Sequence, residues 1–200
     1  LHYTQVVPLD KIPEYRKQDN TSYVQAAYLG TYYYLVNTDR PPVDNVLVRR
    51  ALSYALDRDT LTRTVLQETA IPAYSITPPD TLGYNPPKLF DYDPAKAREL
   101  LAEAGYPSGE GWPGLEIIYN TQEAHRKIAV AIQQMWKKEL NIDVTISNQE
   151  WKVYLNSVSQ RDFQVARRGW IGDYVDANNF LDLFITCLLY TSDAADEWLR

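Results

Sequence analysis

Three short segments rich in apolar and β-branched residues, separated by helical patterns, constrain the fold of this chain most strongly. They are "LEIIYN" at residues 115–120, "IDVTIS" at 142–147 and "DFQVAR" at 162–167. Residues 120–140 place apolar side chains at helical spacing, and a shorter helix is expected from about Glu150. Strands joined by covering helices belong to a parallel sheet with right-handed crossovers. We therefore predict an α/β fold with a mainly parallel sheet flanked by helices.

Upstream of this unit, the sequence predicts one more strand and a long loop. "YLGTYYYLVNT", residues 28–38, is dense in aromatic and β-branched residues and is expected to form a strand that ends at Asn37 and Thr38. Residues 71–87 are rich in proline and predict a long surface connection.

The best-delimited helix follows this loop. Asp93 is a typical N-cap, Pro94 suits the first turn, and Gly105 is a typical stop. Its apolar residues share one face, which we expect to pack against the sheet.

Polar residues at three other helix starts predict caps. Asp44 is expected to cap a helix that begins shortly after it, and Asp59 to cap a second helix after a turn. Asn120 with Glu123 fits a capping box at the start of the longest helix.

The predicted sheet also predicts where a ligand would bind. In open α/β sheets, ligands bind beyond the carboxyl ends of the strands. His125 follows the first predicted strand and Trp151 the second, while Arg167, Trp170 and Asp173 follow the third. These five side chains are expected at one edge of the sheet, where they form the candidate site.

Each candidate also has a simpler interpretation. Asp173 could receive a cationic group such as an α-amine, could be merely solvated beside a helix cap at Asp176, or could pair with Asp176 for glycoside chemistry. Arg167 either pairs with an acid or is presented to an anion. A histidine in a first helical turn, such as His125, usually lies at the surface, and Trp151 could simply pack at the sheet edge.

Composition and motifs exclude several function classes. The formal net charge of -6 argues against a general nucleic-acid binder, and no apolar run is long enough for a membrane helix. The chain lacks the P-loop, dinucleotide, nucleophile-elbow and zinc-protease motifs, and it has 2 histidines. We expect no metal, no cofactor and no enzymatic activity.

The last residues of the chain form a separate case. "CLLYTSDAADE", which begins at Cys187, corresponds to the translation of a transposase-type sequencing adapter. We interpret residues 187–200 as an artefact of sequencing, with an authentic amphipathic tail as the alternative. Cys187 is the only cysteine, so the remaining chain is expected to contain neither a disulfide nor a cysteine-based metal site.

Two long blocks of sequence carry a resemblance to a known family. "YNTQEAHRKIAVAIQQMWKKELNIDVTISNQEWKVYL" and "FQVARRGWIGDYVDANNFLDLF" resemble the periplasmic oligopeptide-binding proteins of ABC importers, and "TYYYLVNTDRPPVDNVLVRRALSYALDRDTL" extends the match upstream. The resemblance implies a periplasmic-binding-protein-like lobe, truncated at both ends. It assigns residues 30–186 to the second of two lobes and residues 1–29 to the end of the first lobe and the linker.

The resemblance also implies roles for the candidate residues. Asp173 would hold the α-ammonium group of a peptide. Arg167 and Trp170 would line the cleft, with Arg167 able to receive a carboxylate. His125 would meet the C-terminus of a longer peptide, and the remaining candidates border side-chain pockets: Trp151 and Tyr33.

Departures from the family are visible in this sequence. Some relatives link cysteines at the positions of Gly30 and Ile171, and some carry a glutamate at the position of Leu35. Because Gly30 and Ile171 are not cysteines, this chain lacks that disulfide. Because Leu35 is uncharged, the resemblance implies a different charge balance in the cleft.

At the level of the whole protein, the resemblance implies a monomeric receptor that captures short peptides and delivers them to an ABC permease and its ATPase. Its location would be the periplasm, or the cell surface as a lipoprotein. The alternatives are another cargo, such as a haem, a nickel chelate or an oligosaccharide, and a hydrolase that uses Asp173 with Asp176.

Overall fold

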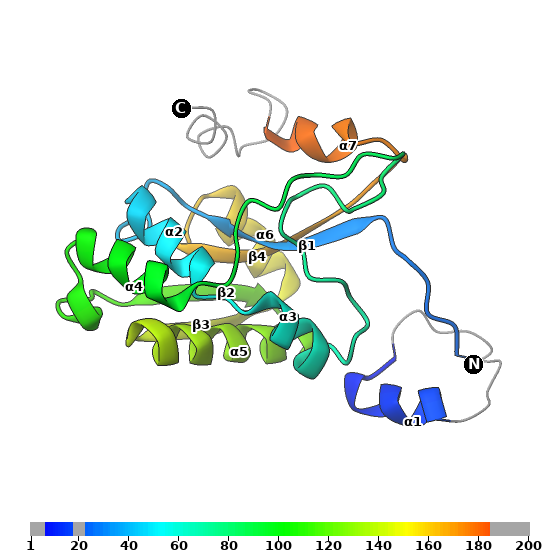
Figure 1. The fold of residues 1–200 in the computed structure, drawn as a ribbon, viewed down its shortest axis with the longest axis horizontal. Coiled ribbons are helices and arrows are strands. Elements are labelled where there is room, and N and C mark those ends of the chain that lie inside the picture. The colour runs from blue at the N-terminus through cyan, green and yellow to red at the C-terminus, as the bar shows by residue number, and fades with distance from the viewer. Residues whose placement is uncertain (1–6, 18–22, 185–200) are drawn as a thin grey trace.

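A four-stranded sheet organises the part of the chain that the computed structural model describes, residues 7–17 and 23–184 (Figure 1). The strand order is β1-β4-β2-β3. β2 runs parallel to both β3 and β4, and β1 runs antiparallel to β4. The prediction of a mainly parallel sheet is therefore confirmed. The strands are β1 (Gly30–Val36), β2 (Leu115–Asn120), β3 (Val144–Gln149) and β4 (Val165–Ile171).

Helices cover both faces of the sheet. The larger core lies between one face and three helices, α2 (Val46–Tyr54), α4 (Pro94–Glu103) and α5 (Glu123–Leu140). A smaller core on the other face joins α6 (Trp151–Ser159) to the sheet through four buried residues: Ile118, Tyr154, Phe163 and Ala166. Burial of apolar side chains on both faces gives the α/β layers predicted from the sequence.

The remaining elements are short. They are η1 (Leu9–Lys11), α1 (Ile12–Lys17), α3 (Arg58–Thr60), η2 (Leu61–Val65), η3 (Pro107–Gly109), α7 (Asn178–Leu181) and η4 (Asp182–Phe184). Within the described residues, no helix combines the length and the apolar character that crossing a bilayer requires. The predicted artefact at residues 187–200 lies outside the described part of the chain.

The fourth strand starts and ends later than predicted. We expected residues 162–167, whereas β4 runs from Val165 to Ile171. Its second half is held by β1, because Arg167 pairs with Tyr34 and Ile171 with Gly30. Arg167 therefore lies inside the strand and not at its end. The predicted start of β3 at residue 142 was early by two residues, since this strand begins at Val144.

Two of the predicted helix caps are displaced by one or two residues. The cap of α2 is Asn45 and not Asp44, because Asn45 Oδ1 accepts a hydrogen bond from the Leu47 amide at 2.9 Å. The cap of α3 is Asp57 and not Asp59, because Asp57 Oδ1 accepts from the Thr60 amide at 2.9 Å. Each true cap stands where the side chain can reach the amide two or three residues ahead.

The predicted capping box of α5 is wrong. Asn120 is the last residue of β2, paired with Gln149 of β3, and Gln122 precedes the helix without a side-chain cap. Asp93, in contrast, caps α4 as predicted, since its Oδ1 accepts from the Lys96 amide at 2.9 Å. Gly105 follows that helix at φ +98°, as a left-handed stop requires.

The apolar face of α4 packs against α2 and α5, and no strand is among its main neighbours. Its buried residues Ala97, Leu100 and Leu101 nevertheless belong to the same core as residues of β2, β3 and β4. The long loop at residues 71–87 is confirmed, with only a short bridge between Thr81 and Tyr84. Figure 1 shows this loop crossing β1, where Thr31 Oγ1 donates to the Ile76 carbonyl at 2.7 Å.

Candidate ligand-binding site

The carboxyl ends of β2, β3 and β4 meet at one edge of the sheet, together with the start of the antiparallel β1. The register at this edge separates the side chains onto two faces. Arg167 is paired with Tyr34, whereas Trp170 is paired with Thr31, so Arg167 and Trp170 point to opposite faces. The predicted site residues therefore share an edge but do not all share a face.

At this edge, Tyr32, Tyr34 and Arg167 project towards the face covered by α5, and with His125 of that helix and Asn120 at the end of β2 they form what we call the Arg167 cluster. The guanidinium carbon of Arg167 lies 4.6 Å from the centroid of the Tyr32 ring. Arg167 Nη1 donates to Asn120 Oδ1 at 3.5 Å. Tyr32 Oη lies 3.4 Å from His125 Nδ1, and the two rings are 5.5 Å apart. The structure thus brings two predicted site residues, Arg167 and His125, into one cluster.

Arg167 carries an unneutralised charge within the described part of the chain. No carboxylate there forms an ion pair with it. Its buried Nε and the buried hydroxyl of Tyr34, its cross-strand partner, have no hydrogen-bond partner among the described residues. Buried polar groups are nearly always paired, so this cluster retains donor capacity that an anionic ligand could use.

His125 is buried, at 5% exposure, and not at the surface as a first-turn histidine usually is. Burial, with a smaller contribution from the charge of Arg167, lowers the pKa of His125 to about 4. The imidazole is therefore neutral at pH 7 and can donate or accept a hydrogen bond without adding a second positive charge. Burial also raises the pKa of Tyr32, so its hydroxyl stays protonated.

The other predicted aromatic residues lie on the face covered by α6. Trp151 is 51% exposed and stacks on Tyr154, with ring centroids 6.0 Å apart. Tyr33 is half-buried and paired with Arg168, and burial raises the pKa of its hydroxyl against the opposing effect of that arginine. These side chains can line a cleft at the sheet edge, but they are not members of the Arg167 cluster.

The loop that carries Asp173 is held by a residue that the sequence did not single out. Asn179 is buried, and its Oδ1 accepts from Trp170 Nε1 at 2.8 Å and from the Asp173 amide at 3.3 Å. The Asp173 side chain is exposed. The only hint in the sequence was the pair of asparagines in "DANN", which also fits an ordinary turn. Asn179 therefore sets the shape of the loop and leaves the carboxylate of Asp173 to the solvent.

Asp176, the partner required for a hydrolase, has a local role. Its Oδ1 accepts from the Asn178 amide at 2.8 Å, directly before α7. The cap position itself is Ala177, so the predicted cap at Asp176 is wrong by one residue although the side chain bonds the start of the helix. This hydrogen bond gives Asp176 a structural role that requires no catalysis.

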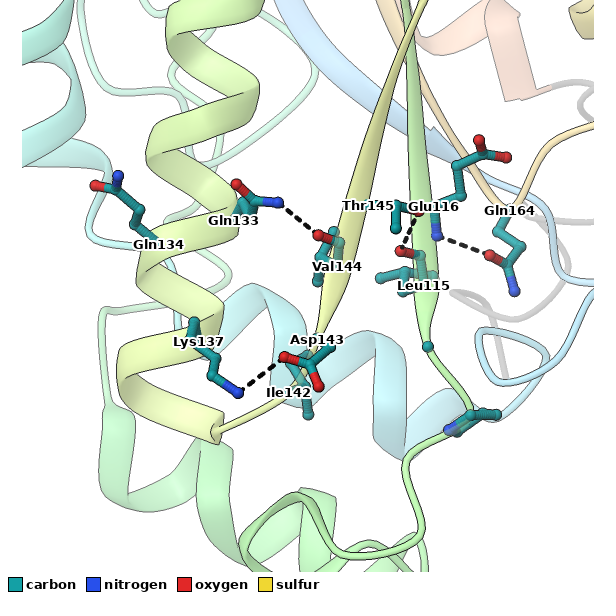
Figure 2. A pocket seen from close by; sticks show the side chains of 12 residues that line it. Leu115, Glu116, Gln133, Gln134, Lys137, Ile142, Asp143, Val144, Thr145 and Gln164 are labelled. Carbon is teal, nitrogen blue, oxygen red and sulfur yellow. Dashed lines mark hydrogen bonds and ion pairs between the residues drawn. The ribbon is translucent and has the colours of Figure 1, made fainter.

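A hollow of about 550 Å³ lies at the opposite end of the strands, where Leu115 and Val144 begin β2 and β3 (Figure 2). Several of its polar groups are paired with one another. Lys137 Nζ contacts Asp143 Oδ1 at 2.8 Å, and Gln133 Nε2 donates to the Val144 carbonyl at 2.5 Å. These contacts leave fewer polar groups there for a ligand. Among the described residues, no group of three metal-ligating side chains occurs either.

The sequence matches the profile of the bacterial extracellular solute-binding proteins, family 5, in its middle part, over residues 1–190. The oligopeptide-binding protein OppA of Bacillus subtilis is 39% identical over 185 residues, which are 89% of this chain and 34% of that protein. The chain thus spans about a third of the length of the curated relatives it matches.

Solved structures show the same similarity. A periplasmic oligopeptide-binding protein from Borrelia burgdorferi superposes with a TM-score of 0.84 at 39% identity, over 96% of this chain and 39% of that one. OppA of Haemophilus influenzae, in complex with the peptide RPPGFSPFR, superposes with a TM-score of 0.80 at 34% identity, over 91% of this chain and 37% of that one. The fold of the described residues is therefore that of a lobe of these binding proteins.

Proposed function

Because the chain belongs to the bacterial extracellular solute-binding proteins of family 5, we propose that it is part of a receptor that captures short peptides for an ABC importer. The observation that carries this proposal is that one sheet edge presents both a positive and a negative side chain, which do not form an ion pair with each other. Arg167 lacks a carboxylate partner among the described residues, and the exposed Asp173 follows six residues later. A free peptide carries a carboxylate and an ammonium group, which these two side chains complement.

The proposed roles follow from the chemistry of each group. Asp173 binds the α-ammonium group, and Arg167 binds a carboxylate through its fork of N–H donors. His125, kept neutral by its surroundings, hydrogen-bonds the C-terminus of a longer peptide. Exposed or half-buried aromatic side chains border the pockets for peptide side chains: Tyr33, Trp151 and Trp170.

The similarity to whole proteins supports a wider proposal. Residues 30–186 are the second lobe of a two-lobed receptor, and residues 1–29 come from the first lobe and the linker. The proposal that residues 187–200 are not native rests on their sequence alone, and the family match extends to residue 190. The names of the relatives include periplasmic proteins, which supports an extracytoplasmic location, in the periplasm or as a cell-surface lipoprotein. We propose a monomer that has no enzymatic activity and delivers peptides to a membrane permease and its ATPase.

Calorimetry on the full-length protein tests this function. We expect di- to pentapeptides to bind with dissociation constants well below about 100 μM, with the peptide recovered intact by mass spectrometry. Absence of heat with every such peptide contradicts the proposal. Binding of a haem, a nickel chelate or an oligosaccharide under the same conditions would identify the other cargo, and cleavage of the peptide would favour the hydrolase.

A further inference from the structure

The geometry of the Arg167 cluster points to a further role: we propose that Tyr32 is a positioning residue that holds the Arg167 guanidinium ready for a ligand carboxylate. This inference rests on the proposed function, because it concerns how the receptor binds the C-terminal end of a peptide. Tyr32 was not among the predicted site residues. It acts through Arg167 and need not touch the peptide itself.

The Tyr32 ring is placed where it can hold a cation. The guanidinium carbon of Arg167 lies 4.6 Å from the ring centroid, inside the range of about 6 Å in which a cation interacts with an aromatic face. Neighbouring rings fix the orientation of Tyr32. The Tyr34 ring meets it edge-on, with ring centroids 5.9 Å apart and an angle of 70° between the ring planes. The His125 ring is tilted against it, with ring centroids 5.5 Å apart. The ring is thereby a fixed platform beneath the charge.

An aromatic platform does something that an acidic partner could not. A carboxylate beside Arg167 would occupy its N–H donors and neutralise its charge, and a peptide carboxylate would have to displace it. The ring attracts the cation through its face and takes none of the N–H groups. Arg167 Nη1 donates to Asn120 Oδ1 at 3.5 Å, which is long, and the Tyr32 hydroxyl also interacts with the guanidinium. The remaining donors stay available for a ligand.

The same arrangement places the charge of Arg167 beside His125. In the described residues, the Tyr32 ring lies against His125, and Arg167 is the charge that acts on it. If the Tyr32 ring were removed, Arg167 could move towards solvent. His125 would then lose one of the two causes that keep its pKa low, and its pKa would rise.

Affinity measurements on the full-length protein test the inference with matched variants. Tyr32→Leu removes the platform, Tyr32→Phe keeps it, and Tyr84→Leu is a control at a partly exposed tyrosine. For Tyr32→Leu we expect roughly a 3- to 30-fold loss of affinity for a peptide with a free C-terminal carboxylate. The same peptide amidated at its C-terminus should lose less than about twofold. Tyr32→Phe should restore most of the affinity, and Tyr84→Leu should leave it unchanged.

Two measurements without peptide keep the inference separate from the proposed function. In nuclear magnetic resonance spectra of the wild type, the Arg167 Nε–H proton should show a ring-current shift that persists in Tyr32→Phe and disappears in Tyr32→Leu. The titration midpoint of His125 should rise in Tyr32→Leu and stay low in Tyr32→Phe. An unshifted Arg167 resonance, or equal loss of affinity for free and amidated peptides, would overturn the role of Tyr32. If the shift is present but no peptide binds, the proposed function fails and the positioning of Arg167 stands.

Discussion

At the scale of single residues, the site depends on where one strand lies beneath one helix. His125 is buried because β1 brings Tyr32 under the first turn of α5. This contact joins residues 93 positions apart, and helical periodicity carries no information about it. The sequence therefore identified His125 and Arg167 as candidates but could not show that they are neighbours, nor that Tyr32 lies between them.

The low pKa of His125 predicts a specific loss of stability in acid. In the unfolded chain the imidazole titrates near about 6.5, and in the folded chain near about 4. Between these values the unfolded state binds more protons, so the contribution of His125 is complete above about pH 6.5 and falls as the pH drops towards 4. The expected loss in the free energy of unfolding is up to about 3 kcal/mol.

Urea unfolding of the full-length protein and of His125→Gln at pH 7 and pH 4.5 measures this term. Carboxylates titrate in both proteins, so the difference between the two pH dependences isolates the histidine. His125→Gln should lose clearly less stability on acidification than the wild type. Parallel pH dependences would show that His125 is not held neutral by the fold.

Asn179 predicts a second residue-level effect. Asn179→Ala leaves the Trp170 indole N–H and the Asp173 amide without their acceptor. We expect a loss of about 1 to 3 kcal/mol in the free energy of unfolding, because two partly buried donors would lose their partner. The neighbouring Asn178 is exposed, and Asn178→Ala should change the stability by less than about 0.5 kcal/mol. Equal effects of the two substitutions would contradict the role given to Asn179.

At the scale of elements, the sequence predicted correctly those strands whose bounds depend on their own residues. β2 was predicted to the residue, because a buried strand bounded by turn residues is legible in the sequence. β4 was placed too early, because its second half is a strand only through its pairing with β1, more than 120 residues away. This error also affected the predicted site, because Arg167 was expected at a strand end, whereas it lies within the strand with its side chain on one face of the sheet.

The exact position of a helix cap is also difficult to predict from the sequence. Asp44 and Asn45 both suit an N-cap, and the sequence alone does not distinguish neighbours of equal propensity. In the structure Asn45 accepts the hydrogen bond. We therefore expect Asn45→Ala to lower the free energy of unfolding by about 1 kcal/mol, whereas Asp44→Ala should have a smaller effect. Urea unfolding of the two variants compares them directly, and a larger loss for Asp44→Ala would reverse the assignment.

At the scale of the whole molecule, the chain represents about a third of the proteins it resembles. In the proposed receptor, the described lobe would supply one wall of the binding site, with a cationic cluster at the sheet edge and an exposed carboxylate on the adjoining loop. A peptide bound between these charges would be oriented by its two termini. A receptor of this kind must distinguish peptides with free termini from peptides whose termini are blocked.

The most direct test of this claim compares one short peptide, free and N-acetylated, on the full-length wild type and on Asp173→Asn, by calorimetry. The wild type should bind the free peptide more tightly by roughly 1.5 to 3 kcal/mol, which corresponds to a charge-assisted hydrogen bond. Asp173→Asn should lose most of this preference while its affinity for the acetylated peptide changes little. If the substitution weakened both peptides equally, or left the preference intact, Asp173 would not be the ammonium receptor and the proposed orientation of the peptide would be wrong.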